Sequence, residues 1–489
     1  MKLFTSLYRA LPAVICSLAV MQAGAEKLVI LHTNDTHSII DPAYDSDLGG
    51  VVRRKAVIDS VRRANKNVML IDAGDVVQGS LYFTLFHGEV EQKIMNALGY
   101  DIQILGNHEF DNGVESLAEQ WKLVNAEKLT SNYDLRGTAL EGLFKPYTIR
   151  RYGDKSVGVI ALNLDPLGMI AADKSEGVVY LDAVKAANAL AWYLKNVEHV
   201  DAVVAVSHVG YDTENPPTPS DLDIARNSED IDIIIGGHSH TLINPDSDKT
   251  PEYKVLNAVG DSVLVVQTGS RGVNLGMVTL DLESGNSSYR LLPVDSRLDD
   301  RIDSDAKALL DPYRQGVDSL MNVKIGRMAQ EMPHSSDLIL NWVADVMLEM
   351  GRELSDRPVD LAIVNKGGIR RGLPKGDITK GMVMTMLPFD NSLVVMDIKG
   401  SDLADGFEVM DYRGGDGVSR GFDYKKIDPD KVYRLATIDY LANGGDYMEP
   451  LTRGKVVANS HERLDEIMMS YLEKNKKKTI KYTDGAKRM

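Results

Sequence analysis

The sequence predicts an α/β protein with two domains of unequal size, and three observations carry this prediction. Short runs rich in apolar and β-branched residues alternate with helix-like stretches from residue 27 to about residue 282. A charged, helix-like stretch follows, and a second alternating segment continues to the end of the chain. With 489 residues, 44% of them hydrophobic and 26% charged, the chain has an ordinary globular composition and is long enough for two or three domains.

The first 25 residues have the pattern of an export signal. Lys2 and Arg9 form a basic start, residues 11–21 are apolar, and small residues at 23–25 form a cleavage site. The apolar stretch is shorter than a membrane span needs, and no later stretch is long enough. We therefore expect export to the periplasm or exterior of a bacterium, with no membrane span. Cys16 is the only cysteine and leaves with the signal, so we expect no disulfide and no thiolate metal site.

The expected mature chain is strongly acidic. Cleavage after residue 25 removes two basic residues and no acidic one, so the net charge becomes 53 − 71 = −18. Long nucleic acid is disfavoured as a partner, because phosphate polymers bind basic surfaces. A small anionic substrate is compatible with this charge if metal ions or a few arginines supply local positive charge. The sequence leaves the oligomeric state open.

The order of the elements sets the expected domain limits after a signal at 1–25. A layered α/β domain is expected at 26–298, because each of its apolar runs has the length of a buried strand. A helical connector interrupted by Pro312 is expected at 299–323, since proline removes a helix hydrogen bond. A smaller α/β domain is expected at 324–489, with a basic tail from residue 474 that we expect to be solvated. The main runs of the first domain lie at 27–35, 67–75, 101–109, 157–164, 201–210, 231–240, 262–269 and 275–282.

Five of these runs end in residue types that bind metal ions. In open α/β sheets ligands sit beyond the carboxyl ends of the strands, so these ends are expected to converge. Each signal is weak alone, because an Asp after a strand is more often a turn former. Together, imidazole, carboxylate and amide groups suit borderline or hard divalent ions such as Zn, Mn, Fe, Co or Mg. Seven candidate ligands suit two ions bridged by Asp75, and they are Asp35, His37, Asp75, Asn107, His208, His238 and His240.

The motifs that contain these residues resemble those of the bimetallic 5′-nucleotidases in the calcineurin-like metallophosphoesterase superfamily. In the first domain they read "TNDTH", "GDVVQGS", "GNHEFD", "SHVG" and "GGHSH". In the second domain, "NKGGIRRG", "PFDNSLVVMDIKG" and "YRLATIDYLANGGDY" resemble the substrate domain of that family. The resemblance covers nearly the whole mature chain. It implies an α/β/β/α sandwich, a connector and a smaller α/β substrate-binding domain.

The resemblance also implies a division of labour among the ligands. One metal ion would be held by Asp35, His37, Asp75 and His240, and the other by Asp75, Asn107, His208 and His238. His108 would protonate the leaving alkoxide or stabilise charge on the phosphoryl group, and Asp111 would fix the tautomer of that imidazole. We assign Glu109 and Phe110 to structure.

The second domain is expected to supply the substrate contacts. Arg370 has a planar fork that matches phosphate, and Gly368 lets the backbone approach an anion in the loop that Asn365 begins. The alternative is a glycine turn with a solvated arginine, because such turns are common. Arg371 and Arg352 both stay open as a second basic contact.

Base recognition departs from the family pattern. The resemblance implies two aromatic rings around the base, but this chain has Leu393 at one position and Met448 at the other. Phe389 or Tyr447 could offer one stacking face, and we therefore expect relaxed base specificity.

The sequence thus predicts a secreted hydrolase of nucleoside monophosphates with two divalent ions, Zn, Mn or Co in preference to Mg. The same centre could serve a 2′,3′-cyclic-nucleotide phosphodiesterase or a nucleotide-sugar hydrolase. A rival of another class is a surface protein that binds nucleotide or metal without catalysis. The presence of both His108 and Asp111 argues against it, because binding alone needs no proton donor.

Overall fold

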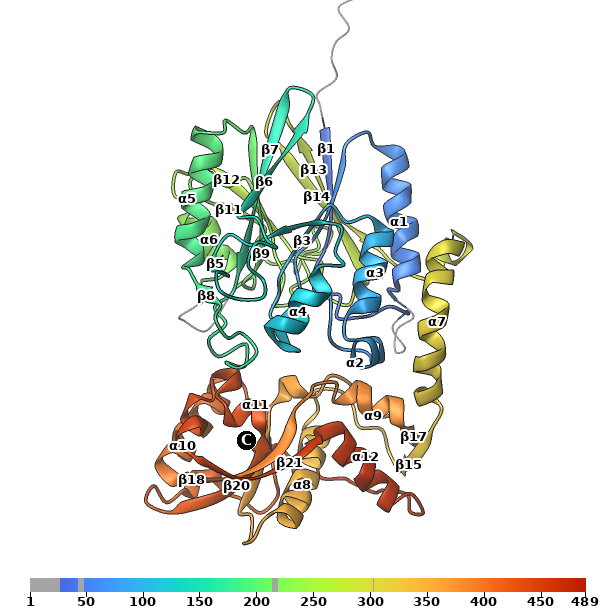
Figure 1. Ribbon diagram of the computed structural model, residues 1–489, viewed down its shortest axis with the longest axis vertical. Helices are drawn as coiled ribbons and strands as arrows, with labels where there is room; N and C mark the ends of the chain where they lie inside the picture. Colours follow the sequence, from blue (N-terminus) through green and yellow to red (C-terminus); the bar gives the residue numbers. More distant parts are fainter. Residues whose placement is uncertain (1–26, 43–47, 213–218, 302) are drawn as a thin grey trace, which may run out of the picture.

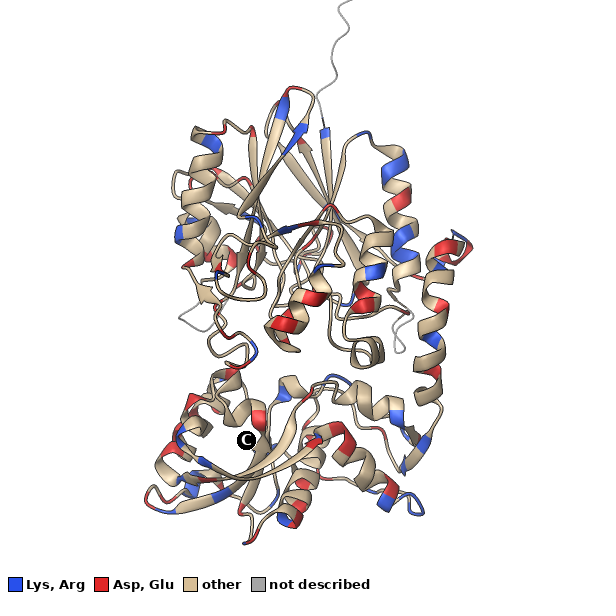
Figure 2. Cartoon of the chain, in the orientation of Figure 1, with Lys and Arg blue, Asp and Glu red and all other residues tan. Residues whose placement is uncertain are grey.

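The computed structural model describes residues 27–42, 48–212, 219–301 and 303–489, so the expected export signal lies outside the described residues. Figure 1 shows a larger amino-terminal domain above a smaller carboxy-terminal one, with one long helix along the side. Basic and acidic residues are scattered over both domains (Figure 2). Among the described residues, none of the helices has the length and apolar character that crossing a membrane requires.

The larger domain contains two six-stranded sheets. The first has the order β14-β13-β1-β2-β3-β4, in which β1 to β4 run parallel and β13 is antiparallel to β1. Its strands are β1 (Lys27–Thr33), β2 (Val68–Asp72), β3 (Ile102–Ile104), β4 (Glu127–Leu129), β13 (Asn274–Asp281) and β14 (Ser287–Pro293). The second has the order β11-β12-β10-β9-β7-β6. Its strands are β6 (Tyr147–Tyr152), β7 (Lys155–Asn163), β9 (Ala202–His208), β10 (Ile233–Ile235), β11 (Lys254–Leu256) and β12 (Ser262–Val266).

Alternation along β1 shows how the layers are built. Leu28 and Ile30 belong to the core shared with the second sheet, whereas Val29 and Leu31 belong to the core beneath the helices. Strands buried on both faces read as continuous apolar runs, as these do in the sequence. The expected layered α/β/β/α fold is therefore confirmed. Its outer helices are α1 (Val51–Ala64), α2 (Leu81–Phe86), α3 (Glu89–Leu98) and α4 (Gly113–Trp121) on one side, and α5 (Ala183–Asn196) and α6 (Asp221–Asn227) on the other.

The connector is one helix, α7 (Ser304–Met321), and it is not interrupted at Pro312 as the sequence predicts. Packing against the larger domain accounts for the difference, because it compensates for the hydrogen bond that proline removes. The Tyr313 ring lies 4.9 Å from that of Phe86, and Arg314 forms an ion pair with Asp41.

The smaller domain is built on a five-stranded sheet with the order β19-β16-β20-β18-β21. A short pair, β15 and β17, lies next to the connector. The strands are β15 (Lys324–Met328), β16 (Leu361–Val364), β17 (Gly376–Thr379), β18 (Ser392–Lys399), β19 (Gly417–Val418), β20 (Val432–Ile438) and β21 (Lys455–Arg463). The helices are α8 (Asp337–Leu354), α9 (Lys380–Met386), α10 (Gly400–Tyr412), α11 (Asp439–Ala442) and α12 (Leu464–Lys474).

The basic tail is not fully solvated, which corrects the expectation from its charge. Arg488 donates hydrogen bonds to both carboxylate oxygens of Asp345 on α8, at 2.7 and 3.0 Å, and to the Tyr482 hydroxyl. Met489 is buried. A run of basic residues indicates a solvated segment only where no buried carboxylate lies close enough to form an ion pair with one of them.

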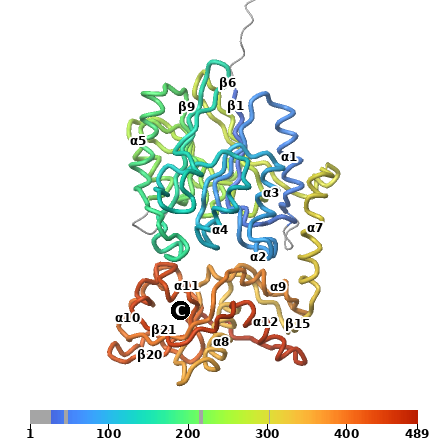
Figure 3. Tube along the Cα trace, viewed as in Figure 1, coloured from blue at the N-terminus to red at the C-terminus, as the bar shows by residue number. Residues whose placement is uncertain are grey.

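The smaller domain packs against α2 of the larger domain and the end of the connector α7 through α9 (Figure 3). Gly381 on α9 makes this approach possible. A Cβ added there would lie 2.9 Å from the Cα of Met321 and 3.1 Å from Cδ1 of Leu81. The contact therefore depends on the absence of a side chain.

Candidate metal centre and substrate cavity

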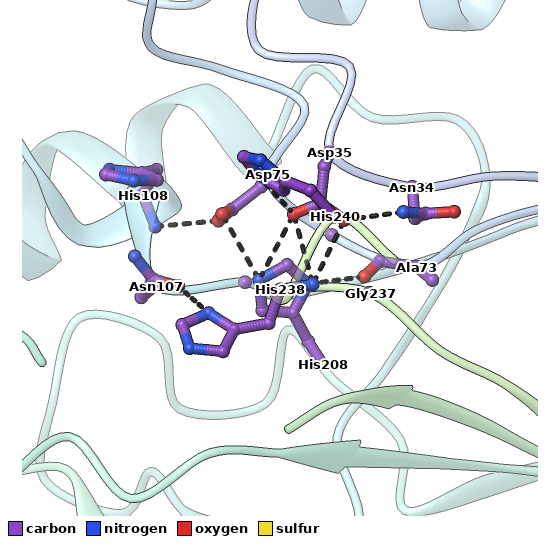
Figure 4. Close-up of polar contacts among 12 residues, drawn as sticks. Asn34, Asp35, Ala73, Asp75, Asn107, His108, His208, Gly237, His238 and His240 are labelled. Carbon is purple, nitrogen blue, oxygen red and sulfur yellow. Dashed lines mark hydrogen bonds and ion pairs between the residues drawn. The ribbon is translucent and has the colours of Figure 1, made fainter. Parts of the chain in front are cut away.

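The carboxyl ends of five strands meet at one edge of the larger domain. Parallel pairing brings the segments after β1, β2 and β3 together in one sheet and those after β9 and β10 together in the other. The packing of the two sheets places both sets side by side. Figure 4 shows the side chains pointing toward a common centre. The structure brings all seven predicted ligands together there: Asp35, His37, Asp75, Asn107, His208, His238 and His240.

The first group consists of Asp35, His37 and His240, whose ligand atoms all lie within 4.8 Å of one another. The Nε2 atoms of the two imidazoles are 2.9 Å apart. Both face Oδ1 of Asp35, at 4.0 Å from His37 and 3.5 Å from His240. Two ring nitrogens and a carboxylate oxygen facing one point form a suitable set for a borderline divalent ion.

The second group consists of Asp75, His208 and His238. Nε2 of His208 lies 3.2 Å from Oδ2 of Asp75, and Nδ1 of His238 lies 3.0 Å from Oδ1 of Asn107. Oδ2 of Asp75 is also 4.0 Å from Nε2 of His37, which belongs to the first group. Asp75 therefore lies between the groups, where a bridging carboxylate would have to be.

Three further features fit these residues to metal binding. The Nδ1–H of His208 donates to the carbonyl of Ala73 at 2.6 Å, which leaves the lone pair on Nε2 for a ligand bond. The acidic surroundings attract positive charge: burial lowers the pKa of His208, but Asp75 outweighs it and raises the pKa above its ordinary value, and a metal ion would take the place of the proton on Nε2. The backbone is also strained, since five candidate ligands have left-handed φ values, which non-glycine residues rarely adopt. They are Asp35 (50°), His37 (47°), Asp75 (54°), His238 (72°) and His240 (55°).

His108 lies next to this centre and is held by Asp111. Its Nδ1 is 3.1 Å from both carboxylate oxygens of Asp111, and its backbone N–H donates to Oδ1 of Asp75 at 2.9 Å. Burial lowers the pKa of His108, but the charges of Asp111 and Asp75 outweigh it and raise the pKa above its ordinary value. An imidazole oriented in this way has the arrangement of an acid–base pair.

A cavity of about 330 Å³ lies between the domains and opens beside the centre. Asn365, Gly368, Arg370 and Phe389 line it from the smaller domain, and His108 and Asp111 are among its residues from the larger one. Nη2 of Arg370 lies 2.7 Å from Nε2 of His108. The guanidinium also lies over the Phe389 ring, 5.2 Å from its centre.

Tyr447, predicted as a stacking residue, does not line this cavity. Its backbone N–H donates to the carbonyl of Gly168 at 3.3 Å, and a Cβ added to Gly168 would lie 2.5 Å from the Tyr447 ring. Asp446 and Tyr447 have φ values of 56° and 61°, and the turn directs the ring to another surface hollow. Arg352 and Arg371, the two candidates for a second basic contact, do not line the cavity either.

Sequence reasoning missed part of the cavity wall. Tyr440 lines it, and its hydroxyl donates to Oδ1 of Asp446 at 3.1 Å. The same hydroxyl lies 3.4 Å from the carbonyl of Met169, so it joins the smaller domain to a loop of the larger one. The motif "YRLATIDYLANGGDY", which contains Tyr440, could have indicated this residue from the sequence. The loop that contains Met169 has no comparable motif. The cavity-lining residues of this loop are Met169, Ile170, Ala171, Asp173 and Lys174.

Comparison with known proteins agrees with this geometry. A calcineurin-like phosphoesterase family model matches residues 28–242, and a 5′-nucleotidase C-terminal domain model matches residues 320–422. The 5′-nucleotidase of Bos taurus is 28% identical over 92% of this chain and 89% of the relative. Protein UshA of Yersinia enterocolitica is 26% identical over 92% and 91%.

A solved structure extends the similarity to the fold. The crystal structure of a 5′-nucleotidase precursor from Thermus thermophilus matches with a TM-score of 0.80 and 30% identity. The match covers 94% of this chain and 98% of that one. Calcineurin-like phosphoesterases use divalent metal ions, and the residues gathered here are able to hold them. This chain therefore belongs to the 5′-nucleotidase family, with a metallophosphoesterase domain followed by a 5′-nucleotidase C-terminal domain, and it is a hydrolase of phosphate esters.

Proposed function

We propose that this protein is an exported, metal-dependent phosphohydrolase that cleaves nucleoside monophosphates to nucleoside and phosphate. One observation carries the proposal: Arg370 and the His108–Asp111 pair face the same cavity as the candidate metal ligands. A phosphate group placed there would meet both a guanidinium fork and a proton donor. Export rests on the sequence pattern of residues 1–25.

We assign two divalent ions to the centre, Zn, Mn or Co in preference to Mg. Bound there, such ions supply charge neutralisation for a phosphoryl group and a more acidic water molecule. One position consists of Asp35, His37, Asp75 and His240. The other consists of Asp75, Asn107, His208 and His238.

The remaining steps belong to side chains around the centre. Arg370 orients the phosphate through its two parallel N–H groups. This frees Nε2 of His108, which Arg370 otherwise contacts, to take up a proton from solvent and pass it to the leaving oxygen. Asp111 keeps the other ring nitrogen protonated and fixes the ring. Asn365 and Gly368 shape the same wall of the cavity.

The charges of the cavity favour a monophosphate over a nucleotide sugar. Beyond the centre and its His108–Asp111 pair, the charged lining residues are Asp173, Lys174, Arg370, Asp390, Asp439 and Asp446. Arg370 is committed to the scissile phosphate, and Asp446 is paired with Arg413. A second phosphate would therefore meet three carboxylates and Lys174 alone, which is electrostatically unfavourable.

Relaxed base specificity follows from the walls of the cavity. Leu393 and Met448, where the family pattern implies rings, are both buried and do not line it. Phe389 packs on Arg370 and so belongs to the phosphate end. Phe110 also lines the cavity but is fully buried in the larger domain. We therefore assign Tyr440 the role of stacking face that the sequence suggested for Tyr447.

We also propose the domain limits 26–298, 299–323 and 324–489. The last strand of the larger domain, β14, ends at Pro293, and the first strand of the smaller domain, β15, begins at Lys324. Only a short 3-10 turn (Ser296–Arg301) and α7 lie between them in the described chain.

Phosphate release from a substrate panel tests the function. Purified mature protein is offered the four common nucleoside monophosphates, 2′,3′-cyclic nucleotides, a nucleotide sugar and an aryl phosphate, with His108→Ala as the control for contaminating phosphatase. We expect the monophosphates to have the highest kcat/KM. A higher value for the cyclic nucleotides or the nucleotide sugar would replace the proposal with that activity. No turnover of any substrate, with metal ions bound, would favour the non-catalytic binding protein.

A further inference from the structure

Glu109 is a buried carboxylate that the proposed reaction does not use. It lies in a 3-10 turn (His108–Phe110) and is 5% exposed. Among the described residues, its hydrogen-bond partners are backbone N–H groups and not Lys or Arg side chains. Burying an unpaired charge is costly unless strong hydrogen bonds offset the cost. The sequence pattern alone assigns this residue to general structure.

Three backbone N–H groups supply those hydrogen bonds. Oε2 of Glu109 accepts from Gly106 at 2.6 Å and from Asp75 at 3.0 Å. Oε1 accepts from Val76 at 2.9 Å. A carboxylate that accepts several backbone N–H groups is strongly held in place.

The three donors come from two different segments of the metal centre. Asp75 and Val76 follow β2, and Asp75 is the candidate bridging ligand. Gly106 follows β3 and directly precedes Asn107, a candidate ligand of the second metal position. A Cβ added to Gly106 would lie 2.6 Å from the backbone nitrogen of Asp75, so these segments are in direct contact. One carboxylate therefore joins the two segments that present Asp75 and Asn107.

The turn that contains Glu109 holds Asp75 from two sides. The backbone N–H of His108 donates to Oδ1 of Asp75 at 2.9 Å, while Glu109 accepts from the backbone of Asp75. Asp75 has a left-handed φ of 54°, which persists only when neighbouring groups enforce it. The consecutive residues His108 and Glu109 therefore fix the side chain and the backbone of Asp75, respectively.

We infer that Glu109 is a positioning residue that sets the spacing of Asp75 and Asn107, and through it the affinity of the second metal position. It touches neither the substrate cavity nor the candidate ligand atoms. The inference rests on the proposed metal centre. Glutamine cannot replace the carboxylate, because its NH₂ group would face a backbone N–H where an acceptor is needed.

The test is metal binding by Glu109→Gln. Metal-free mature protein is titrated with Mn²⁺ or Co²⁺ alone by calorimetry, and the Co²⁺ absorption spectrum reports the geometry. We expect one of two positions to weaken roughly 10- to 100-fold, the usual effect of removing a group that supports a metal ligand. Excess metal should restore kcat, with KM for the nucleotide unchanged. Glu109→Asp keeps the charge and should lie between the wild type and Glu109→Gln.

Asp101→Asn is the matched control. Its Oδ2 accepts from the backbone of Leu70 at 2.8 Å, which joins β2 and β3 at the end away from the metal ligands. We expect this variant to bind both ions like the wild type. Normal metal affinity in Glu109→Gln, or the same loss in both variants, would overturn the inference. A wild type that binds no metal would instead overturn the proposed centre itself.

Discussion

Arg370 and His108 meet across the boundary between the two domains, with Nη2 of the arginine 2.7 Å from Nε2 of the imidazole. Because the guanidinium can only donate, His108 accepts with Nε2, and its proton lies on Nδ1 toward Asp111. In the proposed reaction, the pair joins the phosphate-binding group of one domain to the proton donor of the other. An anion that enters the cavity would compete with Nε2 of His108 for the guanidinium of Arg370.

Arg370→Ala should lower kcat/KM for a nucleoside monophosphate about 10- to 100-fold, since a charge-assisted hydrogen bond contributes about 1.5–3 kcal/mol. Arg370→Lys should recover only part of this, because lysine lacks the fork. Steady-state kinetics measure both variants, with Arg371→Ala as the neighbouring control. Equal losses in Arg370→Ala and Arg371→Ala would mean that the loop, and not this guanidinium, matters.

His108→Ala should keep its metal ions but lose about 10²–10⁴-fold in kcat, the range for one acid–base group. Asp75→Ala should lose activity and metal together, because Asp75 lies between both ligand groups. Metal content and kcat are measured on the same preparations. If both variants lost only metal affinity, His108 would be a structural neighbour of the centre and not its proton donor.

Asp111→Asn should move the alkaline limb of the kcat–pH profile to lower pH. Asp111 is one of the two charges that raise the pKa of His108, so removing it lowers that pKa. A general acid works in its protonated form, and activity is therefore lost as pH rises through its pKa. Asp173→Asn, another carboxylate of the cavity, should leave the limb in place. An unmoved limb in Asp111→Asn would contradict the assigned pair.

A chelator should abolish hydrolysis, and Mn²⁺, Co²⁺ or Zn²⁺ should restore it, because the candidate ligands are all nitrogen and oxygen donors. Activity is measured before and after dialysis, with the metal content determined at each step. Full activity of protein shown to be free of metal would exclude the proposed centre.

The four nucleoside monophosphates should differ in kcat/KM by less than about a hundred-fold, which corresponds to about 2.8 kcal/mol. Stacking on one ring is worth about 1–3 kcal/mol per base and tolerates every base. Tyr440→Ala should therefore raise KM about ten-fold or more for all four, whereas an aryl phosphate serves as the non-nucleotide comparison. Tyr447→Ala is the matched control, since its ring lies outside the cavity. A strong preference for one base would reveal a clamp that the present geometry lacks.

The layered fold and the meeting of the candidate ligands could be predicted from sequence, because both depend on local patterns. Each strand reads as an apolar run, and parallel pairing brings the residues after these runs to one edge. His208 and His238 illustrate this: they lie thirty residues apart, yet their rings are 5.4 Å from each other. The rule that ligands gather beyond the carboxyl ends of parallel strands was sufficient to predict that these two residues lie close together.

The cavity wall could not be predicted in the same way, because it depends on backbone conformation and distant contacts. The direction of the Tyr447 ring follows from left-handed φ values and from a contact with Gly168, which is 279 residues away in the chain. Arg488 pairs with Asp345 across a separation of 143 residues. Periodicity and residue spacing carry no information about such pairs.

The contact at Gly381 has a mechanical consequence for the enzyme. Gly381 adds no side chain of its own to the contact with Leu81 of α2 and Met321 of α7, so α9 packs closely beneath the larger domain at this point. A methyl group added to Gly381 would overlap Met321, and relieving this overlap would rotate one domain relative to the other. We therefore expect a larger side chain at Gly381 to change the width of the cavity without replacing any group that lines it.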